Sequence, residues 1–161
     1  MPIEHPIPPV FLPQKSSILI LGSFPSVKSR EMAFFYGHPQ NRFWRIMANL
    51  FEADVPQTIE QKKQLLLSNH IAVWDVVASC NIEGSADSTM RDVTVNDLSP
   101  ILSQCPIKKI CVNGKTAEKY YKKYTFAQTG RQALLLPSSS PANAAWSLER
   151  LTEAWRTIIF S

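Results

Sequence analysis

Short apolar runs alternate along the chain with segments in which apolar residues recur at helical spacing. The apolar runs occupy residues 18–22, 71–77, 108–114 and 133–137. Because these runs lack the polar alternation of a half-exposed strand, each is typical of a strand buried on both faces. The segments with helical spacing occupy residues 42–51, 59–68, 97–105, 115–124 and 147–159. This order predicts a layered α/β fold, with helices on both sides of a parallel sheet of four core strands.

Two segments fall outside this alternation. Five of the 12 prolines lie within the first 13 residues, which excludes a helix there and predicts an extended, Pro-rich N-terminal arm over residues 1–16. The remaining chain, residues 17–161, is long enough for a single domain with one hydrophobic core. The polar stretch 80–96 shows no periodicity, and a loop of that length in a compact domain is usually functional or mobile.

Composition narrows the class of protein. No run approaches the ~18 consecutive apolar residues of a membrane span, and the N-terminus lacks the basic start and apolar core of a signal peptide. Cys80, Cys105 and Cys111 are odd in number, and none has the spacing of a metal ligand. These features predict a cytoplasmic protein with reduced, buried cysteines and no bound metal. The net charge of +4 mildly favours a polyanionic partner.

Small and hydroxyl-bearing residues follow each of the four predicted strands. The four segments are "GSFPS" (22–26), "WDVVASC" (74–80), "NGKTA" (113–117) and "LPSSSPANA" (136–144). Ligands of open α/β sheets bind beyond the carboxyl ends of the strands, where such residues can donate hydrogen bonds to a phosphate or a base. Each segment alone is also typical of an ordinary turn between a strand and a helix. Four of them at one edge of the sheet favour a binding site.

These four segments, taken in order with "FFYGHPQNRFWRIM" (34–47), resemble the successive motifs of the uracil-DNA glycosylase superfamily. The string around Asn41 is similar to that of mismatch-specific uracil-DNA glycosylases, and the whole set resembles the hypoxanthine (deoxyinosine) DNA glycosylase branch most closely, over about residues 17–160. The resemblance implies a three-layer α/β/α fold and a monofunctional enzyme without metal or cofactor. Such an enzyme flips a deaminated base, here hypoxanthine, out of DNA and excises it hydrolytically in base excision repair.

The resemblance assigns the catalytic role to Asn41. It implies that Asn41 lies beside the scissile bond and positions the attacking water. An amide is too weakly basic to remove a proton from water, so its work is orientation. Asn41 also directly precedes a helical pattern and suits a helix N-cap, a role that is compatible with the first. Phe24 stands where mismatch-specific uracil-DNA glycosylases carry a water-positioning Asn, which argues against efficient excision of uracil.

Four residues are candidates for holding the base. Tyr36 can stack on a flipped base, with a half-buried core tyrosine as the alternative. Phe24 can line the width that a purine needs. Asp75 and Asn113 end the second and third predicted strands, where a side chain can reach a base edge. As alternatives, Asp75 bonds to neighbouring backbone, and Asn113 is a turn residue before Gly114.

A further set of residues is predicted to contact the DNA itself. The serines and the asparagine of the fourth motif resemble a loop that grips phosphates and enters the minor groove, although such a loop also suits the start of the last helix. His38 belongs to a His-Pro pair that is equally typical of a structural turn. The set is Ser23, Ser26, His38, Lys115, Ser138, Ser139, Ser140 and Asn143.

Other functions remain open. A uracil- or mismatch-specific DNA glycosylase shares the motifs, and a DNA-binding module without catalysis shares the surface. A serine hydrolase would use Ser23 or Ser26, although the G-x-S-x-G elbow is absent. Lyase chemistry through a Schiff base is disfavoured because Lys28 and Lys115 have no apolar surroundings that favour a neutral amine. The expected partner is double-stranded DNA with a damaged base, bound by a monomer away from any membrane.

Overall fold

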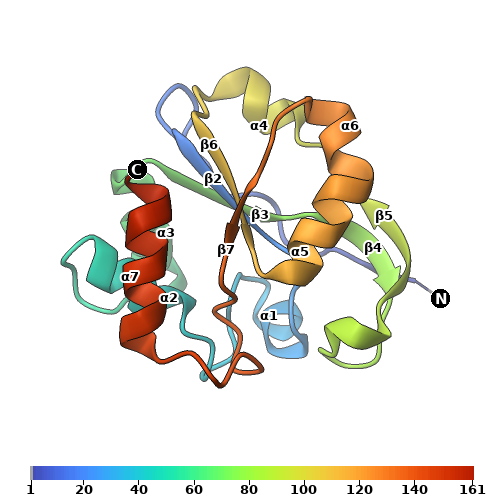
Figure 1. Ribbon diagram of the computed structural model, residues 1–161, viewed down its shortest axis with the longest axis horizontal. Helices are drawn as coiled ribbons and strands as arrows, with labels where there is room; N and C mark the ends of the chain where they lie inside the picture. Colours follow the sequence, from blue (N-terminus) through green and yellow to red (C-terminus); the bar gives the residue numbers. More distant parts are fainter. Residues whose placement is uncertain (1) are drawn as a thin grey trace.

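A computed structural model describes residues 2–161 and contains a central sheet of four parallel strands (Figure 1). In the order β3-β2-β6-β7, the strands are β3 (Ile71–Asp75), β2 (Ile18–Gly22), β6 (Lys109–Asn113) and β7 (Leu134–Leu136). Every neighbouring pair is parallel, which confirms the four predicted core strands. Side chains alternate between the two faces, so that Ile20 and Val73 belong to one hydrophobic core, and Leu19 and Ala72 to the other.

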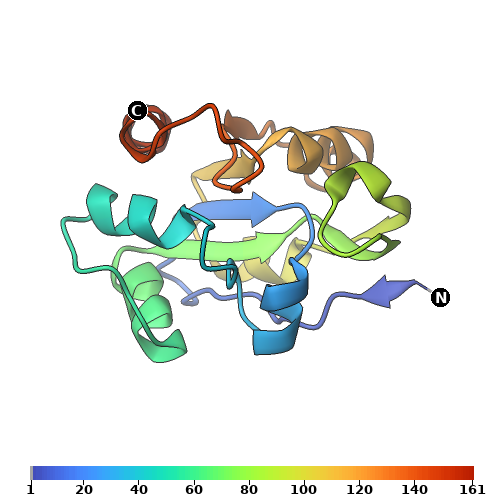
Figure 2. The ribbon, with the colours of Figure 1, turned by 90° about the horizontal axis from the view of Figure 1, so that it is seen from below.

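Helices cover both faces of this sheet (Figures 1 and 2). The core that contains Ile20 is closed by α2 (Phe43–Leu50), α3 (Ile59–Ser68) and α7 (Leu148–Ile159). The core that contains Leu19 is closed by α4 (Ser99–Gln104) and α5 (Lys115–Tyr120), and α5 continues through η2 (Tyr121–Thr125) into α6 (Phe126–Thr129). The predicted α/β/α layers are confirmed.

A second, antiparallel sheet is absent from the prediction. It consists of β1 (Ile3–Glu4), β4 (Val77–Asn81) and β5 (Arg91–Val95), in the order β1-β4-β5. The stretch 80–96 therefore carries β5 and the 3-10 helix η1 (Asp87–Thr89) rather than an irregular loop. Register shifts between β4 and β5 break the side-chain alternation by which strands are recognised in a sequence.

The helix α1 (Val27–Met32) is also absent from the prediction, because six residues are too few to establish a periodic pattern. Its start is defined by Ser26, whose hydroxyl accepts a hydrogen bond from the backbone N–H of Ser29 at 3.1 Å. This cap sets the direction in which the chain leaves β2, and therefore the position of the "GSFPS" turn.

The N-terminal segment over residues 2–16 contains no helix and is paired with both sheets. Val10 pairs with Val73 on β3, and the indole Nε1 of Trp74 donates to the carbonyl of Ile7 at 3.0 Å. Together with the pairing of β1 and β4, these contacts place the arm beside the carboxyl end of β3. The arm is therefore positioned to contribute to anything built at that edge.

Candidate active site

A cavity of about 560 Å³ lies at the carboxyl ends of the four parallel strands, at the predicted edge of the sheet. Figure 1 shows the turns before α1 and α2 and the loop after β7 meeting at this edge. Its volume is in the range of sites for small molecules. Lys115 and Asn143 line an adjoining cavity of about 710 Å³. The other predicted site residues line the first: Ser23, Phe24, Ser26, Tyr36, His38, Asn41, Asp75, Asn113, Ser138, Ser139 and Ser140.

Asn41 lies in the turn before α2, and two hydrogen bonds orient its amide. Its Oδ1 accepts from the backbone N–H of Phe43 at 2.9 Å and from the hydroxyl of Ser139 at 2.8 Å. A backbone N–H can only donate, so the atom that faces Phe43 must be the amide oxygen. Asn41 thus contacts the first turn of α2, but the expected N-cap role is not met, because Arg42 occupies the N-cap position and makes no side-chain cap hydrogen bond. Its Nδ2 has no hydrogen-bond partner among residues 2–161 and is free to donate into the cavity that Asn41 lines.

Asn113, the last residue of β6, has its amide oriented in the same way. Its Oδ1 accepts from the backbone N–H of Ser139 at 3.0 Å, and its Nδ2 donates to the hydroxyl of Ser139, also at 3.0 Å. Both asparagines therefore have their amide oxygens occupied, and what they can offer a ligand is N–H. Ser139 is only 1% exposed. It links the two asparagines and is too deeply buried for the DNA contact predicted for it.

Tyr36 stacks on Phe43, with ring centroids 4.0 Å apart and an interplanar angle of 19°. Its Oη is buried and makes no hydrogen bond within the described part of the chain. Burial and the nearby Asp75 carboxylate raise the pKa of the Tyr36 hydroxyl, which therefore stays protonated. Gly22 permits this approach, because a Cβ there would lie 2.4 Å from Asp75 Oδ1 and 2.9 Å from Tyr36 Oη. An unpaired buried donor of this kind is available to a ligand.

Asp75, at the end of β3, is paired with a residue that the sequence did not indicate. His5 from the N-terminal arm places its Nε2 2.8 Å from Asp75 Oδ2, and both side chains are almost fully buried. The His5 ring packs edge-on against Phe24 and Trp74, with centroid distances of 6.0 and 6.1 Å. The arm therefore contributes to the site. An isolated His in a Pro-rich segment carries no motif by which sequence reasoning finds it.

Asp87 is the second residue that sequence reasoning missed. It begins η1 and lines both cavities, and its carboxylate accepts a hydrogen bond from the Ser23 hydroxyl, with Oδ2 at 3.1 Å. Asp87 is exposed, but partial desolvation beside the cavity raises its pKa above the ordinary value. The Asp75 carboxylate adds to this, while the hydroxyls of Ser23 and Thr116 oppose it. The sequence does not indicate Asp87, because it lies in the aperiodic stretch 80–96, where no motif or periodicity marks a functional residue.

The loop after β7 is held by Arg42, another residue outside the predicted set. The Arg42 guanidinium donates to the carbonyls of Ser140 at 2.7 Å and Asn143 at 3.0 Å, and also to the carbonyl of Trp146. Partial burial, and to a lesser degree Arg45, lower the pKa of Arg42. Arg42 therefore holds these three carbonyls and fixes the loop against the start of α2.

The remaining predicted residues sit in local turns around the opening. Nδ1 of His38 accepts from the backbone N–H of Gln40 at 3.1 Å, so a neutral His38 carries its proton on Nε2 and can donate it. Ser138 and Ser140 accept backbone N–H groups two residues later, which leaves their hydroxyl hydrogens free to donate. The hydroxyl of Ser26 donates to Ser29. Since neither Ser23 nor Ser26 is hydrogen-bonded to a histidine, the arrangement does not favour a serine hydrolase.

Within residues 2–161, no group of three or more His, Cys, Asp or Glu side chains is arranged to hold a metal ion. Over the same residues, no helix is both long enough and apolar enough to cross a membrane. Cys80, Cys105 and Cys111 are free and buried, as predicted.

The fold and the cavity define a class of α/β protein that binds its ligand beyond the carboxyl ends of a parallel sheet. The family model described as the Uracil DNA glycosylase superfamily matches residues 9–159. This chain belongs to that superfamily.

Two named relatives and a solved structure agree with this assignment. The chain is 36% identical over 152 residues to a hypoxanthine DNA glycosylase of Methanosarcina acetivorans, covering 93% of this chain and 94% of that one. It is 34% identical over 151 residues to a hypoxanthine DNA glycosylase of Methanosarcina barkeri, covering 92% of each. The solution NMR structure of a candidate uracil DNA glycosylase from M. acetivorans aligns with a TM-score of 0.79 at 32% identity, over 99% of both chains.

Proposed function

We propose that this protein is a monofunctional DNA glycosylase that flips a deaminated base out of double-stranded DNA and hydrolyses its glycosidic bond, with hypoxanthine as the preferred base. Two relatives that match over nine-tenths of the chain carry that base in their names. The observation that carries the proposal is the orientation of Asn41 and Asn113, whose amide oxygens are both occupied. The cavity therefore presents N–H donors next to the Asp75 carboxylate.

This donor and acceptor pattern fits the edge that deamination creates on a base. Hypoxanthine carries a C6 carbonyl next to an N1–H, whereas adenine carries an amino group next to an unprotonated N1. N–H or O–H groups from Asn113 and Tyr36 suit the carbonyl, and the Asp75 carboxylate suits N1–H. Adenine in the same position leaves the donors of the protein facing a donor of the base, which discriminates against it by orders of magnitude. Undamaged adenine is thereby rejected.

Stacking and water placement complete the proposed site. One face of the Tyr36 ring rests on Phe43, which supports the ring as a platform for a flipped base. Asn41 acts through Nδ2, because its oxygen is engaged with Phe43 and Ser139. An N–H donor holds the oxygen of the attacking water, and the lone pair of that oxygen opposite the hydrogen bond remains free for attack on C1′ of the sugar.

Uracil is the alternative base, because it presents the same carbonyl next to an N–H. What argues for the larger hypoxanthine is the cavity of about 560 Å³ and the aromatic Phe24 in its wall, where an amide would serve the uracil reaction. The protein is further proposed to act as a monomer in the cytoplasm. Its mild positive charge is compatible with a DNA partner.

The experiment is a set of single-turnover excision assays on duplexes that carry one deoxyinosine, one deoxyuridine or no lesion. We expect deoxyinosine to be processed faster than deoxyuridine by ~10-fold or more, a difference of ~1.4 kcal/mol in the barrier, and the undamaged duplex to remain intact. If uracil is released faster than hypoxanthine, uracil is the preferred base and the assignment to hypoxanthine is wrong. If neither lesion yields alkali-labile sites while the protein still binds the lesion duplexes, the protein is a DNA-binding module without catalysis.

A further inference from the structure

The proposed reaction needs a proton acceptor for the attacking water, and none of the roles assigned so far supplies it. When water attacks C1′, a proton must leave that water, and the acceptor has to lie in the cavity. The oxygens of Asn41 and Asn113 accept hydrogen bonds from the protein and are too weakly basic for this task. In His38, the unprotonated ring nitrogen of the neutral form accepts from Gln40. The acceptor must therefore be one of the carboxylates.

Two carboxylates line the first cavity, and their surroundings differ. Asp75 is 3% exposed, lies at the deep end of the cavity and has Oδ2 engaged by His5 at 2.8 Å. Asp87 lies at the junction of the two cavities and receives one hydroxyl hydrogen, from Ser23. Even with the Thr116 hydroxyl nearby, acceptor positions of the Asp87 carboxylate remain open to the cavity.

The segment that carries Asp87 is firmly docked. Arg30 on α1 donates to the carbonyl of Gly84 at 2.6 Å, and the hydroxyl of Ser85 accepts from the N–H of Val27 at 2.8 Å. Within the segment, the Thr89 hydroxyl donates to the carbonyl of Ala86 at 2.7 Å. The stretch 80–96 is thereby tied to the start of α1, next to the "GSFPS" turn, and the position of Asp87 is set by contacts on both sides.

We propose that Asp87 is a catalytic residue that accepts the proton of the attacking water. This inference rests on the proposed function. The water oxygen forms a bond to C1′ while the bond from C1′ to the base nitrogen breaks. The electron pair of the broken bond leaves with the base. One water proton passes to Asp87, which later releases it to solvent, and the departing base takes up a proton from solvent. The negative charge of Asp87 also opposes the positive charge that develops on the sugar.

The electrostatic surroundings of Asp87 suit this role. Asp87 is exposed, but partial desolvation beside the cavity raises the pKa of its carboxylate, and a carboxylate of higher pKa is a stronger base. The ionisable groups that share its cavities are Asp75, Tyr36 and His38 in the first and Lys115 in the second, and the Cys80 thiol lies close enough for Asp87 to raise its pKa. Through its hydrogen bond with Ser23, Asp87 brings a polar group from a different segment to the "GSFPS" turn, which itself carries Phe24.

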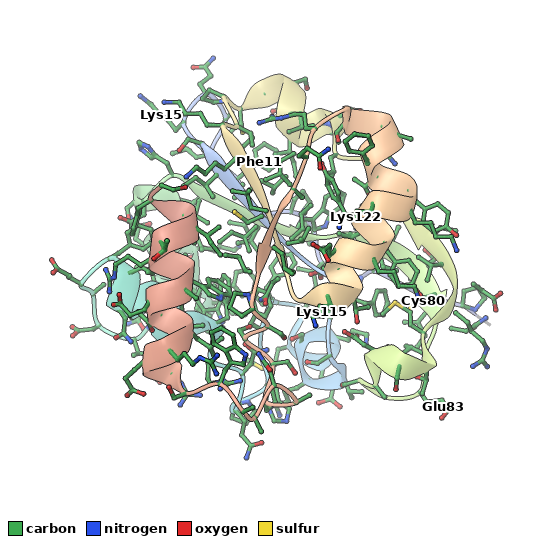
Figure 3. All side chains as sticks on the ribbon, in the orientation of Figure 1. Phe11, Lys15, Cys80, Glu83, Lys115 and Lys122 are labelled. Atoms are coloured by element: carbon green, nitrogen blue, oxygen red, sulfur yellow. The ribbon has the colours of Figure 1, made fainter. Side chains whose placement is uncertain are left out.

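The test compares Asp87→Asn with Glu83→Gln in single-turnover assays on a deoxyinosine duplex. Figure 3 shows Glu83 at the outer edge of the same segment, so Glu83→Gln makes the same charge change away from the cavity. We expect Asp87→Asn to lose ~10²-fold or more in rate without weaker binding of the lesion duplex, and Glu83→Gln to match the wild type. We also expect Asp87→Glu, which restores a carboxylate, to recover at least ~10-fold over Asp87→Asn.

Wild-type rates for Asp87→Asn, or an Asp87→Glu rate no higher than that of Asp87→Asn, overturn the assignment. Thermal melting establishes that each variant is folded at the assay temperature, and Asp87→Ala must show the same loss if Asp87→Asn is unfolded. If the wild type itself excises no base, the proposed function fails. If the wild type is active and Asp87→Asn is equally active, only the role of Asp87 fails.

Discussion

The floor and the rim of the cavity are held in different ways. The floor consists of Tyr36, Asn41, Asp75, Asn113 and Ser139, and the rim of Ser26, His38, Lys115, Ser138 and Ser140. Hydrogen bonds in the floor join residues far apart in the chain, 98 positions between Asn41 and Ser139 and 70 between His5 and Asp75. Hydrogen bonds of the rim side chains join residues two or three positions apart within one turn, and only the rim backbone, at Ser140, is held from a distance, by Arg42.

This difference separates two tasks. The floor exists only when β3, β6, the turn before α2 and the N-terminal arm have all come together, and such a shell holds donors in the precise geometry that bond cleavage requires. The rim is satisfied by its own turns and leaves hydroxyls and a lysine free for a DNA backbone, which carries little sequence information. Substitutions in the floor should therefore change rate or base choice, and substitutions in the rim should change affinity and its salt dependence.

The largest effect is expected at Asn41. Asn41→Ala should lower the single-turnover excision rate by at least ~10²-fold, the scale of loss when a positioned reactant is released, with little change in affinity for lesion DNA. Removal of the contact to the start of α2 should cost ~1 kcal/mol of stability, which thermal melting measures. A wild-type rate in Asn41→Ala would contradict the assignment.

Asn41→Asp sharpens this test. Aspartate keeps an oxygen for the N–H of Phe43 and the hydroxyl of Ser139, but it removes the Nδ2 donor. If the N–H holds the attacking water, Asn41→Asp should lose as much rate as Asn41→Ala while it melts close to the wild type. An active Asn41→Asp would instead show that an oxygen at this position does the work.

A smaller effect, confined to lesion binding, is expected at Tyr36. Tyr36→Ala should weaken binding to a deoxyinosine duplex by ~1–3 kcal/mol through lost stacking. Tyr36→Phe keeps the ring and loses only the hydroxyl that is proposed to face the base carbonyl, so it should lose less affinity than Tyr36→Ala. Since the buried Oη has no partner in residues 2–161, Tyr36→Phe should melt no lower than the wild type. Fluorescence anisotropy on lesion and undamaged duplexes measures both. Equal losses in the two variants would assign the role to the hydroxyl.

Much of the fold follows from the sequence because its strands are continuous apolar runs. The run at residues 18–22 coincides with β2, and the capping box at the start of α3 forms with both of its hydrogen bonds, between Thr58 and Gln61. Signals of this kind are local, so they survive in a single sequence. The second sheet was not predicted because β4 and β5 pair with shifted registers and because β5 is largely exposed.

The candidate site divides in the same way. Tyr36, Asn41, Asp75 and Asn113 were indicated by motif and by strand end, and the structure brings them together in one cavity. His5 reaches Asp75 through the pairing of the N-terminal segment with β4 and β3, and nothing in the sequence around His5 specifies that pairing. His5 and Asp75 are 70 positions apart in the sequence. A residue that is placed by such a distant contact has no local sequence pattern that identifies it.

The smallest effect is expected at the rim, where Lys115 begins α5 and lines the second cavity. If Lys115 contacts a phosphate, Lys115→Ala should reduce the slope of log K against log salt by ~0.9 and leave the single-turnover rate at saturating enzyme unchanged. Lys122 is the matched control, because it lies further along the same helical segment and pairs with Glu118 at 3.6 Å (Figure 3). Lys122→Ala makes the same change in net charge and should leave the slope near that of the wild type. Equal slopes in the two variants would mean that the salt dependence of DNA binding reflects the overall charge of the protein. Lys115 would then make no specific phosphate contact.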